Sequence, residues 1–224
     1  MQPHEYQVHV TNNEHLKDNK FLLQLTYPNG FRFLAGQFVM IKAIKDGKEI
    51  MRPYSIMSLP DEDHLLFYIK LFEQGQLTPI LYNAKPGDEF FISGPFGNLT
   101  HQTIGIPEHI IFIGIGTGIA PIRPLVHYYA QYQATTKLTV IHQERYEQNL
   151  IFAHEFRQMT RYFPVLSKEK SKNALHGHFQ DYVNKWFDKN ATYVIVARRQ
   201  IVNELEDFLL KRGVAGDFIF KERY

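Results

Sequence analysis

The 224-residue chain contains no cysteine. That absence excludes disulfide bonds, Cys-ligated iron–sulfur clusters and Cys-rich zinc sites. Two histidines, His176 and His178, stand two residues apart, but no third ligand accompanies them and no metal site is predicted. If this protein moves electrons, it does so on a bound organic cofactor.

Charge of one sign and long apolar runs are also scarce. The formal net charge of +2 comes without a long basic run, so no nucleic-acid partner is predicted. The most apolar stretch, residues 109–121, is interrupted by Gly114, Gly116 and Gly118 and is too short to span a bilayer. The first residues lack the basic-then-apolar order of a secretory signal. We expect a cytoplasmic monomer with no membrane segment.

The first hundred residues have the pattern of short strands joined by turns. Period-two alternation of apolar and polar residues predicts half-buried strands, and even spacing of such strands favours a small antiparallel β-barrel. The expected strands cover residues 6–10, 21–26, 37–43, 52–57, 65–71 and 89–93, with a connection at 45–48 and one helix at 77–84.

The pattern changes near Pro107. Residues 109–113 form a continuous apolar run, which is typical of a strand buried on both faces. Apolar runs then alternate with helix-length segments, which predicts a parallel sheet with helices on both faces. The expected elements are 119–132, 138–142, 150–162, 163–166, 179–187, 193–197, 200–212 and 218–220. We predict a β-barrel domain over residues 1–104 and an α/β domain over 105–224.

Within the barrel, the segment Arg52-Pro53-Tyr54-Ser55 combines four residues with different chemical properties. Arg52 offers a planar fork of donors suited to phosphate, and Pro53 fixes the backbone between two functional side chains. Tyr54 presents a ring for stacking, and Ser55 supplies a small donor and acceptor. Together they indicate a nucleotide-like cofactor such as a flavin. The alternative is an ordinary half-buried edge strand with a solvated arginine.

A glycine-rich turn follows the first buried strand of the second half. Gly114, Gly116 and Gly118 precede Ala120-Pro121 at the start of the next helix. Glycines there let the backbone approach a pyrophosphate, and a helix N-terminus supplies oriented N–H groups. The generic dinucleotide pattern wants a small residue where Ile119 stands. The alternative is a tight strand-to-helix turn with no ligand.

A third signal is Gly75-Gln76-Leu77-Thr78, at the start of the helix expected within the barrel. Thr78 and the free N–H groups there can hold a second pyrophosphate. A plain helix N-cap would have almost the same sequence.

These motifs, in this order, resemble those of the ferredoxin–NADP reductase family, in which a flavin-binding barrel precedes a nicotinamide-binding α/β domain. The resemblance extends over essentially the whole chain. It rests on four motifs: Arg52-x-Tyr54-Ser55, Gly75-x-Leu77-Thr78, Gly94-Pro95-Phe96-Gly97 and Gly114-x-Gly116-Thr117-Gly118-x-Ala120-Pro121.

The resemblance implies a role for each matching position. Arg52 would contact the flavin phosphate, Tyr54 would stack on the isoalloxazine, and Ser55 would lie near the flavin nitrogen that accepts hydride. Lys70 falls on a strand that in the family runs beside the flavin, and Gly75, Leu77 and Thr78 would form the flavin-pyrophosphate turn. Gly116, Thr117 and Gly118 would hold the nicotinamide dinucleotide. The C-terminal Tyr224 matches an aromatic residue that often covers the flavin; the alternative is a frayed terminus.

The choice between NADP and NAD depends on the 2′-phosphate. A carboxylate about twenty residues beyond the loop favours NAD and a cation favours NADP. Glu144 and Arg145 both occupy that region, which leaves the choice open. Ser167-Lys168 resembles the family's serine–arginine phosphate clamp, with lysine in place of arginine, and favours NADP.

One departure from the family concerns the fourth parallel strand, which usually ends in Cys-Gly near the nicotinamide. Here Ala197-Arg198-Arg199 stands at that place. Ala197 provides no thiol, and Arg198 cannot approach a ligand as glycine does. Hydride-transfer geometry or nicotinamide affinity is therefore expected to differ.

The whole pattern predicts an FAD-dependent NAD(P)H oxidoreductase that binds NAD(P)H across the domain cleft and passes electrons to ferredoxin or flavodoxin. FAD is preferred to FMN because the barrel has room between Arg52 and Gly97 for a helix and turns that can seat an adenine half. Other acceptors remain open: free flavin, a quinone or an oxygenase partner. Two other classes also remain, a non-catalytic flavin-binding regulatory module and a two-domain scaffold without flavin.

Overall fold

The computed structural model describes residues 4–45 and 47–224, and its contacts divide the chain into two compact units. Unit 1 ends at Thr100 and unit 2 begins at His101. The domain boundary predicted after residue 104 falls at the end of the short helix α2 (His101–Ile104), which belongs to unit 2.

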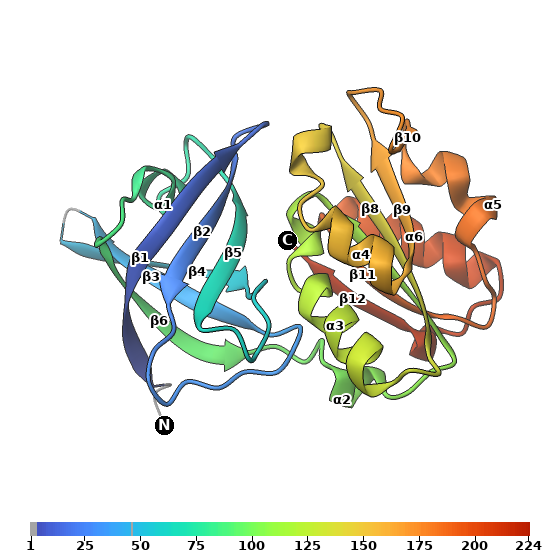
Figure 1. The fold of residues 1–224 in the computed structure, drawn as a ribbon, viewed down its shortest axis with the longest axis horizontal. Coiled ribbons are helices and arrows are strands. Elements are labelled where there is room, and N and C mark those ends of the chain that lie inside the picture. The colour runs from blue at the N-terminus through green and yellow to red at the C-terminus, as the bar shows by residue number, and fades with distance from the viewer. Residues whose placement is uncertain (1–3, 46) are drawn as a thin grey trace. The chain divides into compact units, whose positions relative to one another are not determined.

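Unit 1 is an antiparallel six-stranded sheet with the strand order β4-β3-β6-β1-β2-β5 (Figure 1). This confirms the first half of the predicted fold class. Its elements are β1 (Glu5–Leu16), β2 (Lys20–Thr26), β3 (Phe38–Lys45), β4 (Lys48–Ser55), β5 (His64–Lys70), α1 (Thr78–Asn83) and β6 (Glu89–Phe96).

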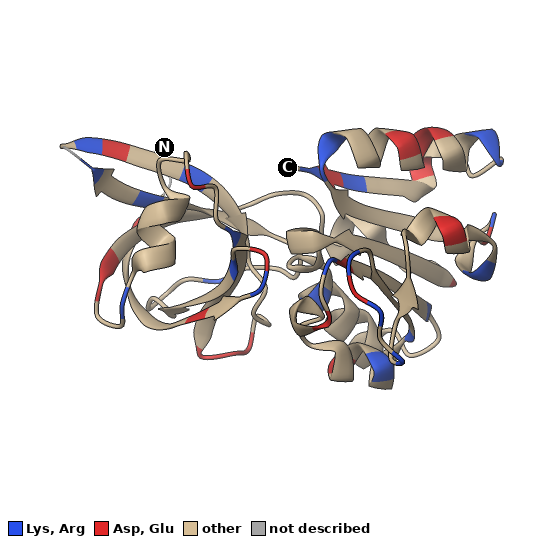
Figure 2. Cartoon of the chain, turned by 90° about the horizontal axis from the view of Figure 1, so that it is seen from above, with Lys and Arg blue, Asp and Glu red and all other residues tan. Residues whose placement is uncertain are grey.

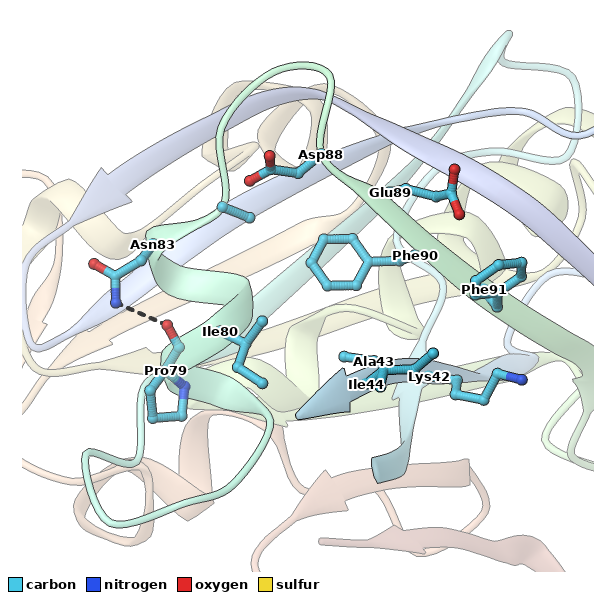
Figure 3. A pocket seen from close by; sticks show the side chains of 11 residues that line it. Lys42, Ala43, Ile44, Pro79, Ile80, Asn83, Asp88, Glu89, Phe90 and Phe91 are labelled. Atoms are coloured by element: carbon cyan, nitrogen blue, oxygen red, sulfur yellow. Dashed lines mark hydrogen bonds between the residues drawn. The ribbon is translucent and has the colours of Figure 1, made fainter. Parts of the chain in front are cut away.

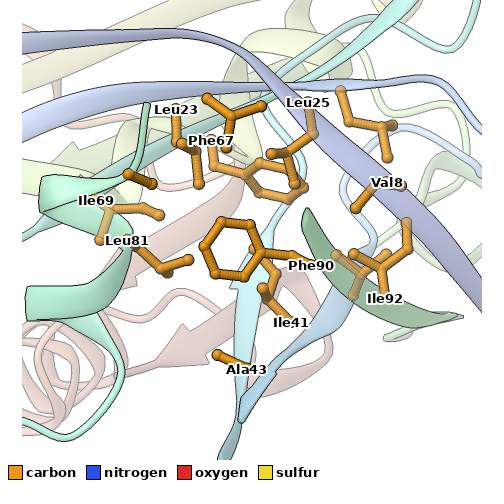
Figure 4. Packing of buried hydrophobic residues seen from close by; sticks show 14 of the residues in the cluster. Val8, Leu23, Leu25, Ile41, Ala43, Phe67, Ile69, Leu81, Phe90 and Ile92 are labelled. Atoms are coloured by element: carbon orange, nitrogen blue, oxygen red, sulfur yellow. The ribbon is translucent and has the colours of Figure 1, made fainter. Parts of the chain in front are cut away.

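Alternating apolar residues of these strands form the core of unit 1. In β2, Phe21, Leu23 and Leu25 are completely buried at every second position. They pack with residues of other strands and of α1, such as Phe67 of the neighbouring β5 and Leu81. Figure 4 shows Leu23 and Leu25 among these side chains. Because successive side chains of a strand point to opposite faces, the period-two pattern of the sequence becomes a filled barrel interior.

The sheet closes on itself just beyond β4. The N–H of Met57 donates to the carbonyl of Leu66 in β5 (2.8 Å), and the N–H of Leu66 donates to Ser58 Oγ (3.1 Å). Up to Ser55, β4 pairs with β3. It therefore lies at one end of the strand order, where Pro53, which lacks an N–H, is tolerated.

The strands around β4 are longer than the sequence predicts. The hairpin of β3 and β4 pairs out to Lys45 and Lys48, because antiparallel pairing continues through charged residues. The predicted connection at 45–48 includes Asp46, which lies outside the described residues. α1 spans Thr78–Asn83, slightly less than the predicted 77–84.

Unit 2 is a parallel six-stranded sheet with the order β10-β9-β8-β7-β11-β12. This confirms the second half of the fold class. After α2 its elements are β7 (His109–Ile115), the 3-10 helix η1 (Gly116–Ile119), α3 (Ile122–Tyr132), β8 (Lys137–Glu144), η2 (Glu147–Asn149), α4 (Ala153–Met159), β9 (Arg161–Leu166), β10 (Leu175–His176), η3 (Phe179–Tyr182), α5 (Val183–Trp186), β11 (Thr192–Ala197), α6 (Arg199–Lys211), η4 (Gly216–Phe218) and β12 (Ile219–Arg223).

Helices cover both faces of this sheet, α3 and α4 on one and α5 and α6 on the other (Figure 1). The central strands β7 and β11 are therefore buried almost throughout, as their continuous apolar runs predict. From β7 the chain builds β8, β9 and β10 on one side, and then returns to place β11 on the other. The order of strands reverses between β7 and β11, and ligands of open α/β sheets bind outside the carboxyl ends of the strands at such a point.

Two helices of unit 2 are shorter than predicted, whereas α6 has the predicted length. The expected helix at 119–132 begins as η1, and α3 itself starts at Ile122 after Pro121. The expected helix at 150–162 is reduced to α4, because residues from Arg161 onward pair as β9. Among the described residues, no helix is long and apolar enough to cross a membrane.

A charged cluster joins α3 to α4 beside this sheet. Arg123, only 4% exposed, donates two hydrogen bonds to the carboxylate of Glu155 (2.9 and 3.2 Å), and His127 lies 2.8 Å from the same carboxylate. Burial alone would raise the pKa of Glu155, but the hydrogen bonds from His127 and Arg123 outweigh it and lower that pKa to about 2. The ionised carboxylate therefore stabilises the folded unit.

We expect Glu155→Gln to lower the unfolding free energy of unit 2 at pH 7 by about 2 kcal/mol, since it weakens charged hydrogen bonds. Because the folded-state pKa is depressed, the contribution is complete above about pH 4.5, the ordinary value for a glutamate. It is lost as the pH falls toward 2, so the two proteins should converge there. Unfolding is followed by the fluorescence of Trp186, the single tryptophan of the chain, which lies in unit 2.

The matched control is Glu108→Gln, which removes an exposed carboxylate from the same unit. It should leave the pH dependence of stability unchanged. A constant difference between wild type and Glu155→Gln from pH 7 to pH 2 would contradict this account of the cluster.

Candidate functional sites

The predicted flavin motif lies on β4. Arg52 and Tyr54, two residues apart, are on the same face of the strand. They pair across the sheet with Ile41 and Val39 of β3, which are both buried. Arg52 is exposed, and its guanidinium donates to the carbonyl of Met51 (2.7 Å). The remaining guanidinium N–H groups stay at the surface of the barrel, where they suit an anionic group.

Tyr54 is half-buried against the core of unit 1. Burial raises the pKa of its phenol to about 12, and the nearby charge of Arg52 opposes that shift. The hydroxyl is therefore neutral at physiological pH. The ring of Tyr54 packs partly against the core, and the cation Arg52 lies near it. This arrangement fits a flat aromatic cofactor that carries phosphate.

Other predicted flavin residues already have partners within unit 1. Lys70, at the end of β5, forms an ion pair with Asp18 of the β1–β2 turn (3.1 Å). The hydroxyl of Thr78 donates to the carbonyl of Phe72 and accepts from its N–H, both at 3.0 Å. Leu77 is 2% exposed, so the turn offers its backbone rather than its side chain. The flavin roles of these residues remain predictions.

Thr78 is not the N-cap of α1. The N-cap is Leu77, which makes no side-chain capping bond, and Thr78 is the first helical residue. Its hydroxyl closes the turn between β5 and α1 instead. Gly75 is required by the same turn, because a Cβ there would lie 2.9 Å from the carbonyl oxygen of Phe72.

A groove of about 590 Å³ also opens on unit 1, between β3, α1 and the start of β6 (Figure 3). Its floor is apolar, with Ala43, Ile80 and Phe90, and Lys42 lies at one end. The ammonium of Lys42 is paired with Glu5 (2.6 Å) and Glu49 (3.1 Å). None of the predicted flavin residues lines this groove, which sequence reasoning did not anticipate.

In unit 2, the chain leaves β7 at the point where the strand order reverses, through residues 114–121, here called the glycine loop. Gly118 lies against the end of β11, so closely that an added Cβ would be 2.0 Å from the carbonyl oxygen of Val196. A Cβ on Gly114 would lie 3.0 Å from atoms of Ile119 and Ile122. Gly116 has a φ of +61°, a conformation that favours glycine. The fold itself therefore favours glycine over a larger residue at each of these three positions.

The rest of the loop divides into buried and accessible residues. Ala120 and Pro121 are buried where η1 joins α3. Gly116 and Thr117 are partly exposed, and they form the first turn of η1. The accessible groups are thus the backbone of this turn and the hydroxyl of Thr117, which can donate to a phosphate oxygen.

The C-terminal Tyr224 also contacts this loop. Its phenol hydroxyl donates to the carbonyl of Ile115. Burial raises the pKa of this phenol, while hydrogen bonds from the Thr117 side chain and the Gly118 backbone, together with the charge of Arg198, oppose the shift. The residue is 54% exposed, and its hydroxyl contacts the loop through the carbonyl of Ile115.

The tyrosine is held there by the edge of the sheet. β12 pairs with β11 up to Ala197 and Arg223, and the N–H of Tyr224 donates to the carbonyl of Ala197 (3.3 Å). The terminus is therefore anchored, in contrast to the frayed alternative. Its expected role over a flavin remains a prediction.

Two loops at the carboxyl edge of the sheet carry the predicted 2′-phosphate residues. The N–H of Ser167 donates to the carbonyl of Glu144 (2.9 Å), and that of Lys168 donates to the carbonyl of Arg145 (3.2 Å). Glu144 is buried at the end of β8, whereas Arg145 and Lys168 are both exposed. At this edge Arg145 and Lys168 are therefore accessible and the Glu144 carboxylate is not, while the roles of these residues remain predictions.

The paired histidines have other contacts. His176 lies 3.0 Å from the carbonyl of Glu169, and the N–H of His178 donates to Asp181 (2.8 Å) at the start of η3. Over residues 4–45 and 47–224, no group of three side chains is arranged to hold a metal ion.

Two known domain families match this chain. Residues 7–101 match the oxidoreductase FAD-binding domain family, and residues 112–197 match the oxidoreductase NAD-binding domain family. The first match includes the β4 motif, and the second includes the glycine loop and β11.

Individual relatives point the same way. A ferredoxin–NADP reductase of Pseudomonas aeruginosa is 32% identical over 75% of this chain and 71% of its own length. A flavodoxin/ferredoxin–NADP reductase of Buchnera aphidicola is 27% identical over 87% of this chain and 85% of its own. The crystal structure of a ferredoxin NADP⁺ reductase from Neisseria gonorrhoeae, with bound FAD and NADP, has the same fold (TM-score 0.88, 19% identity, 98% of both chains). The chain therefore belongs to the ferredoxin–NADP reductase family of FAD-dependent NAD(P)H oxidoreductases.

Proposed function

We propose that this protein is an NADPH-dependent flavoprotein reductase that passes electrons to a ferredoxin or a flavodoxin. The observation that carries the proposal is the glycine loop at the reversal of strand order in unit 2. There, Gly116 and Thr117 are partly exposed and present the backbone of a 3-10 turn and a hydroxyl group. The pyrophosphate oxygens of a dinucleotide accept hydrogen bonds from donors of this kind.

The side chains on β4 are proposed to bind FAD. Arg52 would pair with a flavin phosphate, and the ring of Tyr54 would stack on the isoalloxazine. Ser55, next along the strand, would donate a hydrogen bond to the polar edge of the same ring system. Bound FAD supplies the chemistry of accepting a hydride and releasing electrons one at a time. The protein contributes position and exclusion of water.

NADPH rather than NADH is proposed as the donor because of the charges at the carboxyl edge of unit 2. Arg145 and Lys168 are adjacent through a backbone hydrogen bond, and both side chains are exposed. Two cations beside one another favour the extra dianionic phosphate of NADP. Burial of Glu144 leaves no exposed carboxylate at the end of β8 to hold the ribose hydroxyls of NAD.

The proposed acceptor follows from the names of the relatives, which are ferredoxin and flavodoxin reductases. Ala197 at the end of β11 provides no thiol beside the nicotinamide, but positioning of the two ring systems does not depend on one. A non-catalytic flavin-binding module is the competing hypothesis, and it is favoured only by that substitution.

The experiment that tests the proposal is an anaerobic titration of the flavin-loaded protein with NADPH and with NADH, followed by the flavin absorption band. We expect NADPH to bleach the band at concentrations at least tenfold lower than NADH. Reduced protein should then transfer electrons to a ferredoxin or flavodoxin faster than to free flavin or a quinone. A yellow protein that neither nucleotide bleaches would establish the non-catalytic module.

Tyr54→Ala is expected to weaken flavin retention about tenfold, because an aromatic contact contributes roughly 1.5 kcal/mol beyond its buried area. Tyr54→Phe is the matched variant, which keeps the ring and removes only the hydroxyl. It should retain flavin within about twofold of wild type. The dissociation constant is measured by flavin fluorescence after dialysis, and equal retention by all three proteins would exclude the stacking role.

Lys168→Gln should raise the dissociation constant for NADPH by about tenfold and leave that for NADH within twofold, since the removed charge would face only the 2′-phosphate. Lys170→Gln, which removes an exposed cation two residues further on, is the control and should change neither value. Equal weakening of both nucleotides by Lys168→Gln would contradict the proposed phosphate clamp.

A further inference from the structure

The reversal of strand order brings three chain segments of unit 2 to one place. They are the glycine loop after β7, the end of β11 at Ala197-Arg198, and the terminal Tyr224 after β12. Gly118 touches the end of β11 through Val196, and Tyr224 bonds to Ala197 and to the loop. Arg198, the next residue after β11, therefore stands beside the groups proposed to hold pyrophosphate.

The side chain of Arg198 is exposed and does not contribute to the hydrogen bonding of the fold. Within residues 4–45 and 47–224 its guanidinium makes no hydrogen bond and no ion pair. Its backbone continues from Ala197, whose carbonyl accepts the N–H of Tyr224, and the Tyr224 hydroxyl donates to Ile115 at the start of the glycine loop. A cation without a protein counter-ion therefore follows directly on the segment that adjoins the glycine loop.

Its placement is also unfavourable for the helix that follows. Arg198 is the N-cap of α6 and Arg199 is the first helical residue, and no acidic residue occupies the first turn. Figure 2 shows basic segments, in blue, near the labelled C-terminus. The positive end of a helix dipole repels cations, so each arginine there lowers the stability of the helix. Violations of such local rules occur where function requires them.

We propose that Arg198 is a binding residue for the pyrophosphate of the nicotinamide dinucleotide, at the place where the family carries glycine. This rests on the proposed function and extends it. The guanidinium would pair with a pyrophosphate oxygen whose other partners are the Thr117 hydroxyl and the Gly118 N–H. The bound dianion would also cancel the repulsion at the start of α6, because an anion there is favoured by the dipole. The loss of glycine at this position is then compensated by a charged contact.

The test uses the flavin-loaded protein and measures binding of oxidised NADP⁺ by calorimetry, so that no turnover is involved. Arg198→Gln is compared with Arg198→Lys, which keeps the charge, and with Arg199→Gln, which removes the neighbouring exposed cation. A second probe is adenosine 2′-monophosphate, which carries the 2′-phosphate and has no pyrophosphate. Thermal unfolding of each variant is recorded in parallel.

We expect Arg198→Gln to weaken NADP⁺ binding about tenfold, Arg198→Lys to weaken it less, and Arg199→Gln to leave it within twofold. Binding of adenosine 2′-monophosphate should be the same in all four proteins. The difference between wild type and Arg198→Gln should shrink at high salt, because it is electrostatic. The unfolding temperature of Arg198→Gln should be equal to or above that of wild type, which a structural role would not produce.

Three results would overturn the inference. One is unchanged NADP⁺ affinity in Arg198→Gln, including the case in which that variant instead raises the KM for an acceptor protein. Another is equal weakening of both probes, which would place Arg198 at the 2′-phosphate. The third is a wild-type protein that binds no NADP⁺ and whose flavin is not reduced, which would remove the proposed function as well.

Discussion

The contact between Gly118 and the end of β11 is the constraint on which the nucleotide site depends. A hydrogen atom is all that fits between the α-carbon of Gly118 and the carbonyl of Val196. This closeness turns the chain after β7 into a tight 3-10 turn, and it leaves the first turn of η1 facing outward with its donors accessible. Because β7 and β11 lie where the strand order reverses, the turn opens where α/β sheets bind their ligands.

Charge is distributed in unit 2 according to the same geometry. The exposed cations Arg145, Lys168 and Arg198 all follow the carboxyl ends of strands, whereas Glu144 at such an end is buried. Charged groups that only support the fold are paired differently, as Arg123 is with Glu155 between two helices. The cations at the edge of the sheet are thus exposed, whereas Arg123 is buried in an ion pair that supports the fold.

The two units differ in how much of their sites is visible in the sequence. On β4, alternation along one strand places Arg52 and Tyr54 on one face, and the pattern alone predicts it. The roles suggested for Lys70 and Thr78 are less direct, because the structure ties these side chains to Asp18 and Phe72 through contacts that close turns. Such contacts join residues from different elements, and a linear pattern does not reveal them.

The sequence by itself determined the fold class, the order of the two units and the motifs on β4 and after β7, because these depend on local periodicity and on glycine spacing. Element lengths differed, as in α4, where pairing of β9 ends the helix. Only the tertiary structure decided that Glu144 is buried while Arg145 is exposed, and that Tyr224 reaches the glycine loop beside Arg198. Those relations arise from strand order and register, which bring together residues more than a hundred positions apart in the chain.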